Sequence, residues 1–203
     1  MEQYRGIKFD VNVIDTIFPN FPEQKDLITW GRKLCELGCI PTYPDPIDHD
    51  RTCSAGNLSI RSDDHFIITA AGSHLGKLSD TDFVEVLDVD VDAQLITAAG
   101  MLEPSSETML HGEIYTFRKD IRVIFHGHND LILKYADTLG LRSTKKHYPY
   151  GSVKLLQSVI HILNESVDFI VMKNHGFISL GKTCQEAGNL VIKVLSKIEK
   201  EIS

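Results

Sequence analysis

Residues 121–128 read Ile-Arg-Val-Ile-Phe-His-Gly-His. The first five of them are rich in β-branched and aromatic side chains, which predicts a buried strand that ends near His126. Because residues two apart in a strand point to the same side, His126 and His128 can present both imidazoles to one point. Imidazole is a common zinc ligand, so this pair predicts half of a metal site, with structural or exposed histidines as the alternative.

The rest of the chain predicts a single α/β domain. Further runs of β-branched and aromatic residues predict strands, and apolar residues at helical spacing predict helices. Because neighbouring strands are joined by short turns, we expect a largely antiparallel or mixed sheet. The expected strands cover 57–61, 66–69, 83–89, 94–97, 121–125, 169–172 and 177–180, and the expected helices cover 23–37, 130–139, 152–163 and the stretches after Pro104 and Thr183.

Two N-terminal regions lack these patterns. Residues 1–22 mix apolar positions with Pro19 and Pro22, and we expect a loosely structured arm in front of a domain of residues 23–203. The proline-rich stretch from Pro41 to Pro46 is expected to be a loop, because proline does not fit a helix interior. A total of 203 residues is long enough for one sizeable core and short for two.

Composition narrows the classes of partner. A net charge of −7 argues against nucleic acid as the main partner, because a phosphate backbone attracts a basic surface, but it permits a small anionic substrate. No apolar run approaches the roughly 20 residues that span a bilayer, and the N-terminus lacks the pattern of a secretory signal. The four cysteines show no Cys-x-x-Cys spacing and are expected to be reduced thiols. We therefore expect a cytoplasmic protein without a membrane partner.

A third histidine and a glutamate extend the metal hypothesis. His175 follows the expected strand 169–172, at a second sheet end. Glu107 is expected in the first turn of a helix, where a carboxylate also complements the helix dipole without any metal. Three imidazoles and a carboxylate make a plausible zinc site, and a carboxylate that can leave the metal is also a base. His111 lies one turn beyond Glu107, as a further ligand or as a residue that supports the ligands.

Two short stretches predict anion-binding corners. Ser105 or Ser106 is expected to be the N-cap of the helix after Pro104, and the free N–H groups at a helix start attract anions. In the other stretch, Gly56 allows close backbone approach and the side chain of Asn57 can donate to a phosphate oxygen. Gly72, after the expected strand 66–69, can close the same pocket. Ordinary turn chemistry is the alternative for these glycines and for Asn57.

Five short motifs occur in a fixed order: Gly56-Asn57-Leu58-Ser59-Ile60-Arg61, Ile68-Thr69-Ala70-Ala71-Gly72, Pro104-Ser105-Ser106-Glu107, His126-Gly127-His128 and Asn174-His175-Gly176. Together they resemble the class II aldolase/adducin-like family, which includes fuculose-phosphate aldolase and ribulose-phosphate epimerase. The resemblance covers about residue 25 to the end of the chain. It implies a three-layer α/β/α fold with a central sheet, and a cyclic homotetramer with active sites at subunit contacts.

The resemblance also implies roles for individual residues. Glu107 would be a metal ligand that swings off the metal to act as the base. The aldolases of the family have glutamate at this position and the epimerases have aspartate, so Glu107 favours an aldolase. The implied zinc ligands are Glu107, His126, His128 and His175, and the implied phosphate-binding residues are Gly56, Asn57, Gly72, Ser105 and Ser106.

The chain departs from the family pattern in two places. Ala71 stands where the aldolases usually have a threonine that contacts phosphate, so one hydroxyl donor is missing. The segment between His128 and His175 is shorter than in the aldolases and lacks the stretch with their proton-donating tyrosine. Tyr148 and Tyr150 are candidate replacements for that catalytic tyrosine, and aromatic packing in front of a helix is the alternative reading.

Taken together, the residues and the resemblance predict a zinc-dependent aldolase that cleaves a small sugar phosphate through a metal-stabilised enediolate. Another divalent metal is an alternative to zinc. An epimerase or a sugar-phosphate dehydratase of the same family, and a non-catalytic adducin-like interaction module, are the alternative functions. A metallo-β-lactamase-like hydrolase is disfavoured, because Leu131 follows Asp130 where that family has another histidine.

Overall fold

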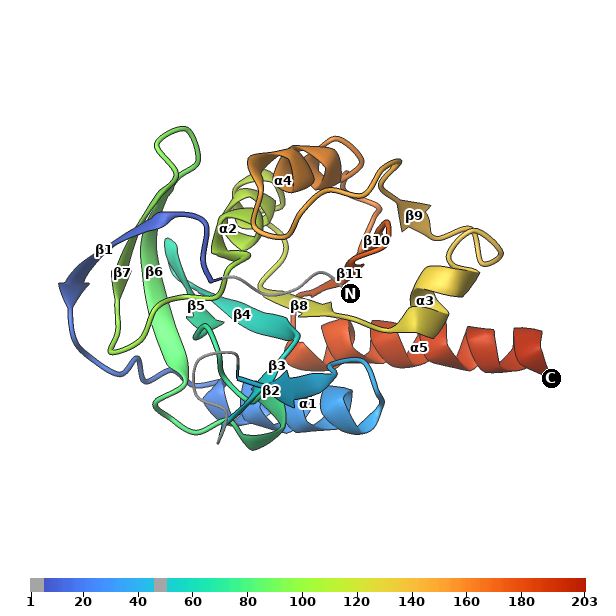
Figure 1. The fold of residues 1–203 in the computed structure, drawn as a ribbon, viewed down its shortest axis with the longest axis horizontal. Coiled ribbons are helices and arrows are strands. Elements are labelled where there is room, and N and C mark those ends of the chain that lie inside the picture. The colour runs from blue at the N-terminus through green and yellow to red at the C-terminus, as the bar shows by residue number, and fades with distance from the viewer. Residues whose placement is uncertain (1–5, 46–50) are drawn as a thin grey trace.

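The computed structural model describes residues 6–45 and 51–203 and is built around a nine-stranded sheet (Figure 1). The strand order is β1-β7-β6-β5-β4-β8-β11-β10-β9. The outermost pair at each edge is parallel and the pairs between them are antiparallel, so the predicted mixed sheet is confirmed. The strands are β1 (Asp10–Asp15), β4 (Gly56–Ser62), β5 (His65–Thr69), β6 (Phe83–Asp90), β7 (Leu95–Ala99), β8 (Val123–Gly127), β9 (Arg142–Ser143), β10 (Phe169–Met172) and β11 (Gly176–Gly181).

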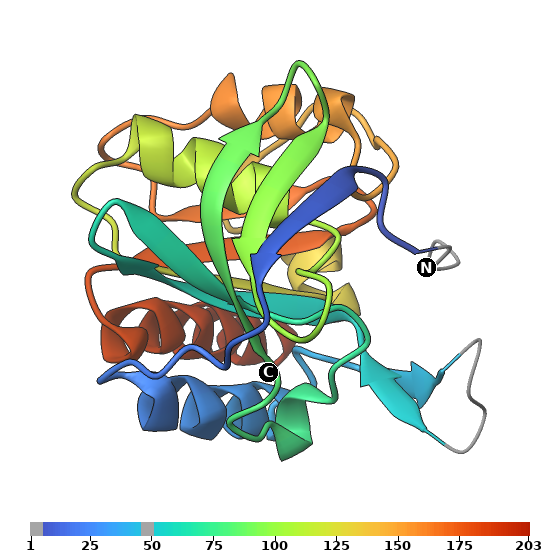
Figure 2. The ribbon, with the colours of Figure 1, turned by 90° about the vertical axis from the view of Figure 1, so that its left-hand side faces the viewer.

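Helices cover both faces of this sheet, which confirms the three-layer α/β/α fold (Figure 2). One buried cluster joins the sheet to α1 (Gln24–Glu36), α3 (Asp130–Tyr135) and α5 (Cys184–Ile202). A second cluster joins the opposite face to α2 (Thr108–Phe117) and α4 (Val153–Ile160). A two-stranded sheet of β2 (Thr42–Pro44) and β3 (Thr52–Ser54) and the short helix η1 (Leu75–Lys77) complete the described elements. None of the helices within the described residues combines the length and apolarity that crossing a bilayer requires.

The start of α5 follows the capping pattern of its sequence. Thr183 Oγ1 accepts a hydrogen bond from the Glu186 N–H at 3.1 Å. Glu186 Oε2 in turn accepts from the Lys182 N–H at 2.8 Å. The first bond satisfies an N–H group that the helix itself leaves unpaired, and the second holds the residue in front of the N-cap. The helix therefore begins at the Thr-Cys-Gln-Glu motif.

The expectation of a loosely structured N-terminal arm is wrong for residues 10–15. They form β1, which pairs in parallel with β7 at one edge of the sheet. Most side chains of β1 are exposed, so the strand depends on hydrogen bonds to a partner far along the chain and shows little local hydrophobic pattern. The division of the chain at residue 22 remains a prediction.

Three smaller expectations need correction. Residues 42–44 of the expected loop pair as β2 with β3, whereas positions 46–50 lie outside the described residues. The helix expected over 130–139 ends at Tyr135. Ser105 and Ser106 do not cap α2; Glu107 occupies the N-cap position, without a capping hydrogen bond from its side chain.

Close packing between α1 and α5 gives a stability prediction at Gly188. A Cβ added there would lie 2.2 Å from two atoms of the rigid Trp30 ring, far inside van der Waals contact. We expect Gly188→Ala to lower the free energy of unfolding by about 2 kcal/mol, because overpacking outweighs the gain in helix propensity. Urea denaturation checks this, with Ser196→Ala on α5 as the control. A Gly188→Ala protein as stable as the parent would contradict this packing.

Candidate metal centre

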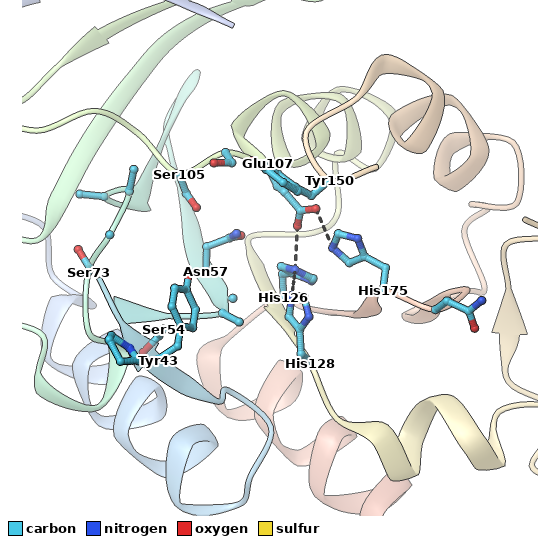
Figure 3. A pocket seen from close by; sticks show the side chains of 18 of the residues that line it. Tyr43, Ser54, Asn57, Ser73, Ser105, Glu107, His126, His128, Tyr150 and His175 are labelled. Atoms are coloured by element: carbon cyan, nitrogen blue, oxygen red, sulfur yellow. Dashed lines mark hydrogen bonds and ion pairs between the residues drawn. The ribbon is translucent and has the colours of Figure 1, made fainter. Parts of the chain in front are cut away.

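Four elements bring the predicted ligands to one place (Figure 3). His126 lies in β8 and His128 follows the end of that strand. His175 lies in the turn between β10 and β11, and Glu107 stands at the N-cap of α2. Gly176 permits this crowding, because a Cβ there would lie 2.4 Å from the Gly127 oxygen and 3.0 Å from His126 Cε1. Strand pairing therefore brings the histidine side chains together, and Gly176 lets the neighbouring strands approach each other closely.

The three imidazoles face one another. Their ring centroids are separated by 4.7 Å (126 to 128), 5.0 Å (128 to 175) and 5.3 Å (126 to 175). One ligand nitrogen from each ring lies within 4.8 Å of the other two. His126 Nε2 and His128 Nε2 are 3.0 Å apart, although two bare nitrogens would repel each other. A shared cation or a shared proton explains this spacing.

Glu107 faces the same point from the helix side. Its Oε2 lies 2.9 Å from His126 Nε2, and its Oε1 lies 3.0 Å from His175 Nε2. The residue is 3% exposed. Burial alone would raise the pKa of this carboxyl group, but the charges of His126 and His175 hold it well below its ordinary value. Glu107 is therefore an ionised carboxylate that can bind a cation or accept a proton.

The histidines are held in orientations that suit metal binding. The Nδ1–H of His126 donates to the Phe177 carbonyl at 2.9 Å, which directs Nε2 toward the cluster. Burial and the neighbouring charges of His126 and His175 lower the pKa of His128 well below its ordinary value, so its imidazole is neutral. Within the described part of the chain, both Glu107 oxygens and His175 Nε2 lack an aligned hydrogen-bond partner although they are buried. Three imidazole nitrogens and one carboxylate thus fit a divalent cation such as zinc.

A pocket of about 360 Å³ opens beside this cluster and falls within the size range of small-molecule sites. All of the predicted phosphate-binding residues line it. Its lining comprises Tyr43, Pro44, Ser54, Ala55, Gly56, Asn57, Ala70, Ala71, Gly72, Ser73, Ser105, Ser106, Glu107, His126, His128, His147, Tyr150, Asn174 and His175. The structure therefore places the candidate anion corners and the candidate metal ligands in one cavity.

Several features of this lining suit a polar ligand. Gly56 adopts φ +134°, and a Cβ there would lie 2.6 Å from the His126 oxygen, so its position requires glycine. Asn57 is 4% exposed, and its Oδ1 has no hydrogen-bond partner among the described residues. Ser105 bonds to the start of α2 through its carbonyl, which accepts from the Thr108 N–H at 3.0 Å, so its hydroxyl is not used as a helix cap. Polar groups at this end of the pocket are thus positioned to meet a ligand.

The two candidate tyrosines have different surroundings. Tyr150 is 9% exposed and lines the pocket, whereas Tyr148 packs against the buried cluster of α2 and α4. The structure does not bring Tyr148 to the pocket, and the catalytic role of this residue stays a prediction. His111 is fully buried and its Nδ1 lies 2.7 Å from Ser59 Oγ. Burial lowers the pKa of His111 to about 3, and it does not belong to the converging histidine cluster.

Sequence reasoning missed several lining residues. Tyr43, Ser54 and His147 come from β2, β3 and an irregular stretch, where no local pattern shows which way a side chain points. Asn174 could be recognised from the sequence, because it directly precedes His175. Asparagine also tolerates the left-handed backbone conformation, which Asn174 adopts at φ +57°. Unusual backbone conformations of this kind cluster at functional sites.

Comparison with known proteins agrees with the geometry. The sequence model of the family described as "Class II Aldolase and Adducin N-terminal domain" matches residues 51–196. The chain belongs to this family. It is 34% identical to L-fuculose phosphate aldolase of Methanocaldococcus jannaschii over 149 residues, which is 66% of this chain and 76% of the relative. The predicted family resemblance is therefore confirmed.

Two further relatives extend the comparison. The chain is 46% identical to methylthioribulose-1-phosphate dehydratase of Leptospira biflexa over 78 residues, which is 37% of this chain and 36% of the relative. The crystal structure of L-fuculose-1-phosphate aldolase from Thermus thermophilus superposes with a TM-score of 0.65 at 19% identity, over 88% of this chain and 91% of that chain. The structural match supports the fold, and the sequence matches place aldolases and a dehydratase among the relatives.

Proposed function

We propose that this protein is a divalent-metal-dependent aldolase that cleaves a small sugar phosphate, with zinc as its metal. The observation that carries the proposal is the convergence of three imidazoles and an ionised, buried carboxylate beside a pocket with donors for an anion. His126, His128, His175 and Glu107 would hold the cation. When bound, such a cation polarises a carbonyl group and stabilises the negative charge that develops as a carbon–carbon bond breaks.

Glu107 supplies the base in this proposal. Its carboxylate is ionised and enclosed, so it can accept the proton of the substrate hydroxyl next to the bond that breaks. The loss of that proton lets the hydroxyl oxygen become a carbonyl as the bond electrons move to the other fragment. Because Glu107 stands at the N-cap of a helix that packs against the sheet, its backbone is fixed while its side chain can turn.

The polar end of the pocket holds the phosphate away from the reacting carbons. Asn57, Ser105 and Ser106 offer side-chain donors, and Gly56 and Gly72 let the backbone approach closely. Contacts remote from the reacting bond position the substrate and contribute to the rate. Ala71 lines the same pocket without a hydroxyl, so we expect weaker phosphate binding than a threonine there would give.

A dehydratase is the second candidate, because a relative that is 46% identical over 78 residues is named methylthioribulose-1-phosphate dehydratase. Both reactions need a cation at a carbonyl and a base nearby, so the ligand set does not separate them. Glu107 at the base position favours cleavage over epimerisation within the resembled family. A non-catalytic interaction module has no need for four enclosed ligands, and the metal cluster argues against it.

We further propose the homotetramer of the resembled family as the working assembly. Large apolar side chains remain exposed near β1 and after β7, among them Ile14 at 60%, Phe18 at 48% and Met101 at 55% exposure. A subunit contact would bury such side chains. Light scattering after size-exclusion chromatography tests this assembly, and a monodisperse monomer would contradict it.

An assay of the zinc-loaded protein against a panel of ketose 1-phosphates tests the proposed reaction. We expect at least one member to release dihydroxyacetone phosphate and an aldehyde, in amounts that match the ketose consumed. The same samples are analysed for loss of water from methylthioribulose 1-phosphate. Dehydration without any carbon–carbon cleavage would replace the aldolase proposal with the dehydratase.

A further inference from the structure

Tyr150 forms part of the pocket wall beside Glu107 (Figure 3), yet no strand or helix holds it. It lies in the irregular stretch between β9 and α4. An aromatic residue in such a stretch needs other contacts to keep its ring in one place, because each freely rotating side chain loses entropy when it is fixed. Several contacts to Tyr150 come from the other end of the chain.

Residues Gly6–Phe9, here called the N-terminal strap, hold both ends of Tyr150. The Tyr150 hydroxyl donates a hydrogen bond to the Gly6 carbonyl at 3.1 Å. The Lys8 ammonium donates to the Tyr150 carbonyl at 2.7 Å and lies 3.7 Å from the centroid of the tyrosine ring. The second contact has the geometry of a cation–π interaction. A single lysine thus contacts both the backbone and the ring of this pocket residue.

The N-terminal strap is itself anchored to the sheet. Phe9 is 7% exposed and belongs to the core under α2 and α4. Its neighbour Asp10 donates a backbone hydrogen bond to the Gln94 carbonyl at 2.9 Å and opens β1. The core and the sheet therefore hold the strap in place, and the strap can in turn position Tyr150.

The neighbouring Gly151 is closely surrounded by the Ser106 backbone and the Lys8 side chain. Gly151 adopts φ +61°, and a Cβ there would lie 2.8 Å from the Ser106 carbonyl oxygen and 3.8 Å from side-chain atoms of Lys8. The backbone next to Tyr150 thus fits between the strap and the serines of the anion corner. Movement of the strap would change the wall of the pocket.

We propose that Lys8 is a positioning residue that holds the Tyr150 ring against the pocket, so that the ring forms a wall for the bound sugar phosphate. The strap lies outside residues 51–196, the part of the chain that the family model matches. The kinetic consequence rests on the proposed function, whereas the placement of Tyr150 does not.

Fluorine NMR of zinc-loaded protein labelled with 3-fluorotyrosine tests the placement directly. A Tyr150→Phe sample assigns the Tyr150 resonance among the six tyrosines. We expect Lys8→Met to shift or broaden this resonance and Lys8→Arg to restore it, because arginine keeps the charge and the donors. Lys25→Met, which removes one charge from an exposed site on α1, should leave the resonance unchanged. A Tyr150 resonance that is the same in Lys8→Met and the parent would overturn the proposal.

Steady-state kinetics with the substrate found in the panel test the consequence for binding. We expect Lys8→Met to raise KM roughly two- to fivefold with unchanged kcat, because this is the change in binding that the loss of an exposed cation–π contact gives. Lys8→Arg should recover most of the lost substrate binding. Equal KM values in Lys8→Met and the parent would refute a role in substrate binding. If the parent cleaves no member of the panel, the proposed function fails, and the fluorine spectrum alone decides the placement of Tyr150.

Discussion

A Glu107→Gln variant is expected to lose aldol cleavage by a factor of about 10²–10⁴, the usual contribution of a positioned base. Glutamine has nearly the same shape, so it fills the same space at the N-cap of α2. It cannot accept the substrate proton, because an amide is a far weaker base than the carboxylate it replaces. We expect the three histidines still to retain the metal, since each of them keeps its Nε2.

The rate of cleavage and the metal content must be measured on the same preparation. Glu113→Gln is the matched control, because it makes the same chemical change on α2 at a residue that does not line the pocket. We expect this control to cleave at the parental rate. If Glu107→Gln cleaves as fast as the parent while both hold zinc, Glu107 is not the base.

Strands with a strong local pattern could be predicted from the sequence. The run Phe169–Met172 is apolar and β-branched or aromatic over most of its length, and the strand has the predicted bounds. β1 could not be predicted, because its edge position leaves most side chains exposed and its stability comes from pairing with β7. β9 is only two residues long and pairs with β10, so its sequence also carries no periodic signal.

The candidate ligands could be found because their positions follow from short-range rules. His126 and His128 share a side by strand geometry, and His175 follows a strand that lies in the same sheet. The sequence predicts Glu107 in the first turn of a helix, which is close to the N-cap position that it occupies. The order of five motifs then connected these separate positions through a known family.

Part of the pocket wall could not be found in this way. Tyr43 reaches the pocket from the small sheet, and Tyr150 is held by Gly6 and Lys8, which lie at the opposite end of the sequence. Such contacts depend on how separate elements pack, and nothing in the local sequence reports them. The choice between Tyr148 and Tyr150 needed the structure for the same reason.

Removal of two imidazoles is expected to abolish stable metal binding. A His126→Ala/His128→Ala variant leaves only His175 and Glu107 of the four converging groups, and fewer ligands hold a divalent cation far more weakly. A His65→Ala/His161→Ala variant is the control, since it removes two histidines that do not line the pocket. Circular dichroism and thermal unfolding of both variants establish that each is folded before its metal is counted.

The most direct test is the zinc content of these proteins by mass spectrometry, after loading and exhaustive dialysis. We predict about one zinc ion per chain in the parent and in the control, and less than about a tenth of an ion in the folded His126→Ala/His128→Ala protein. A folded double variant that keeps one zinc ion per chain, or a parent that retains none, would contradict the metal centre.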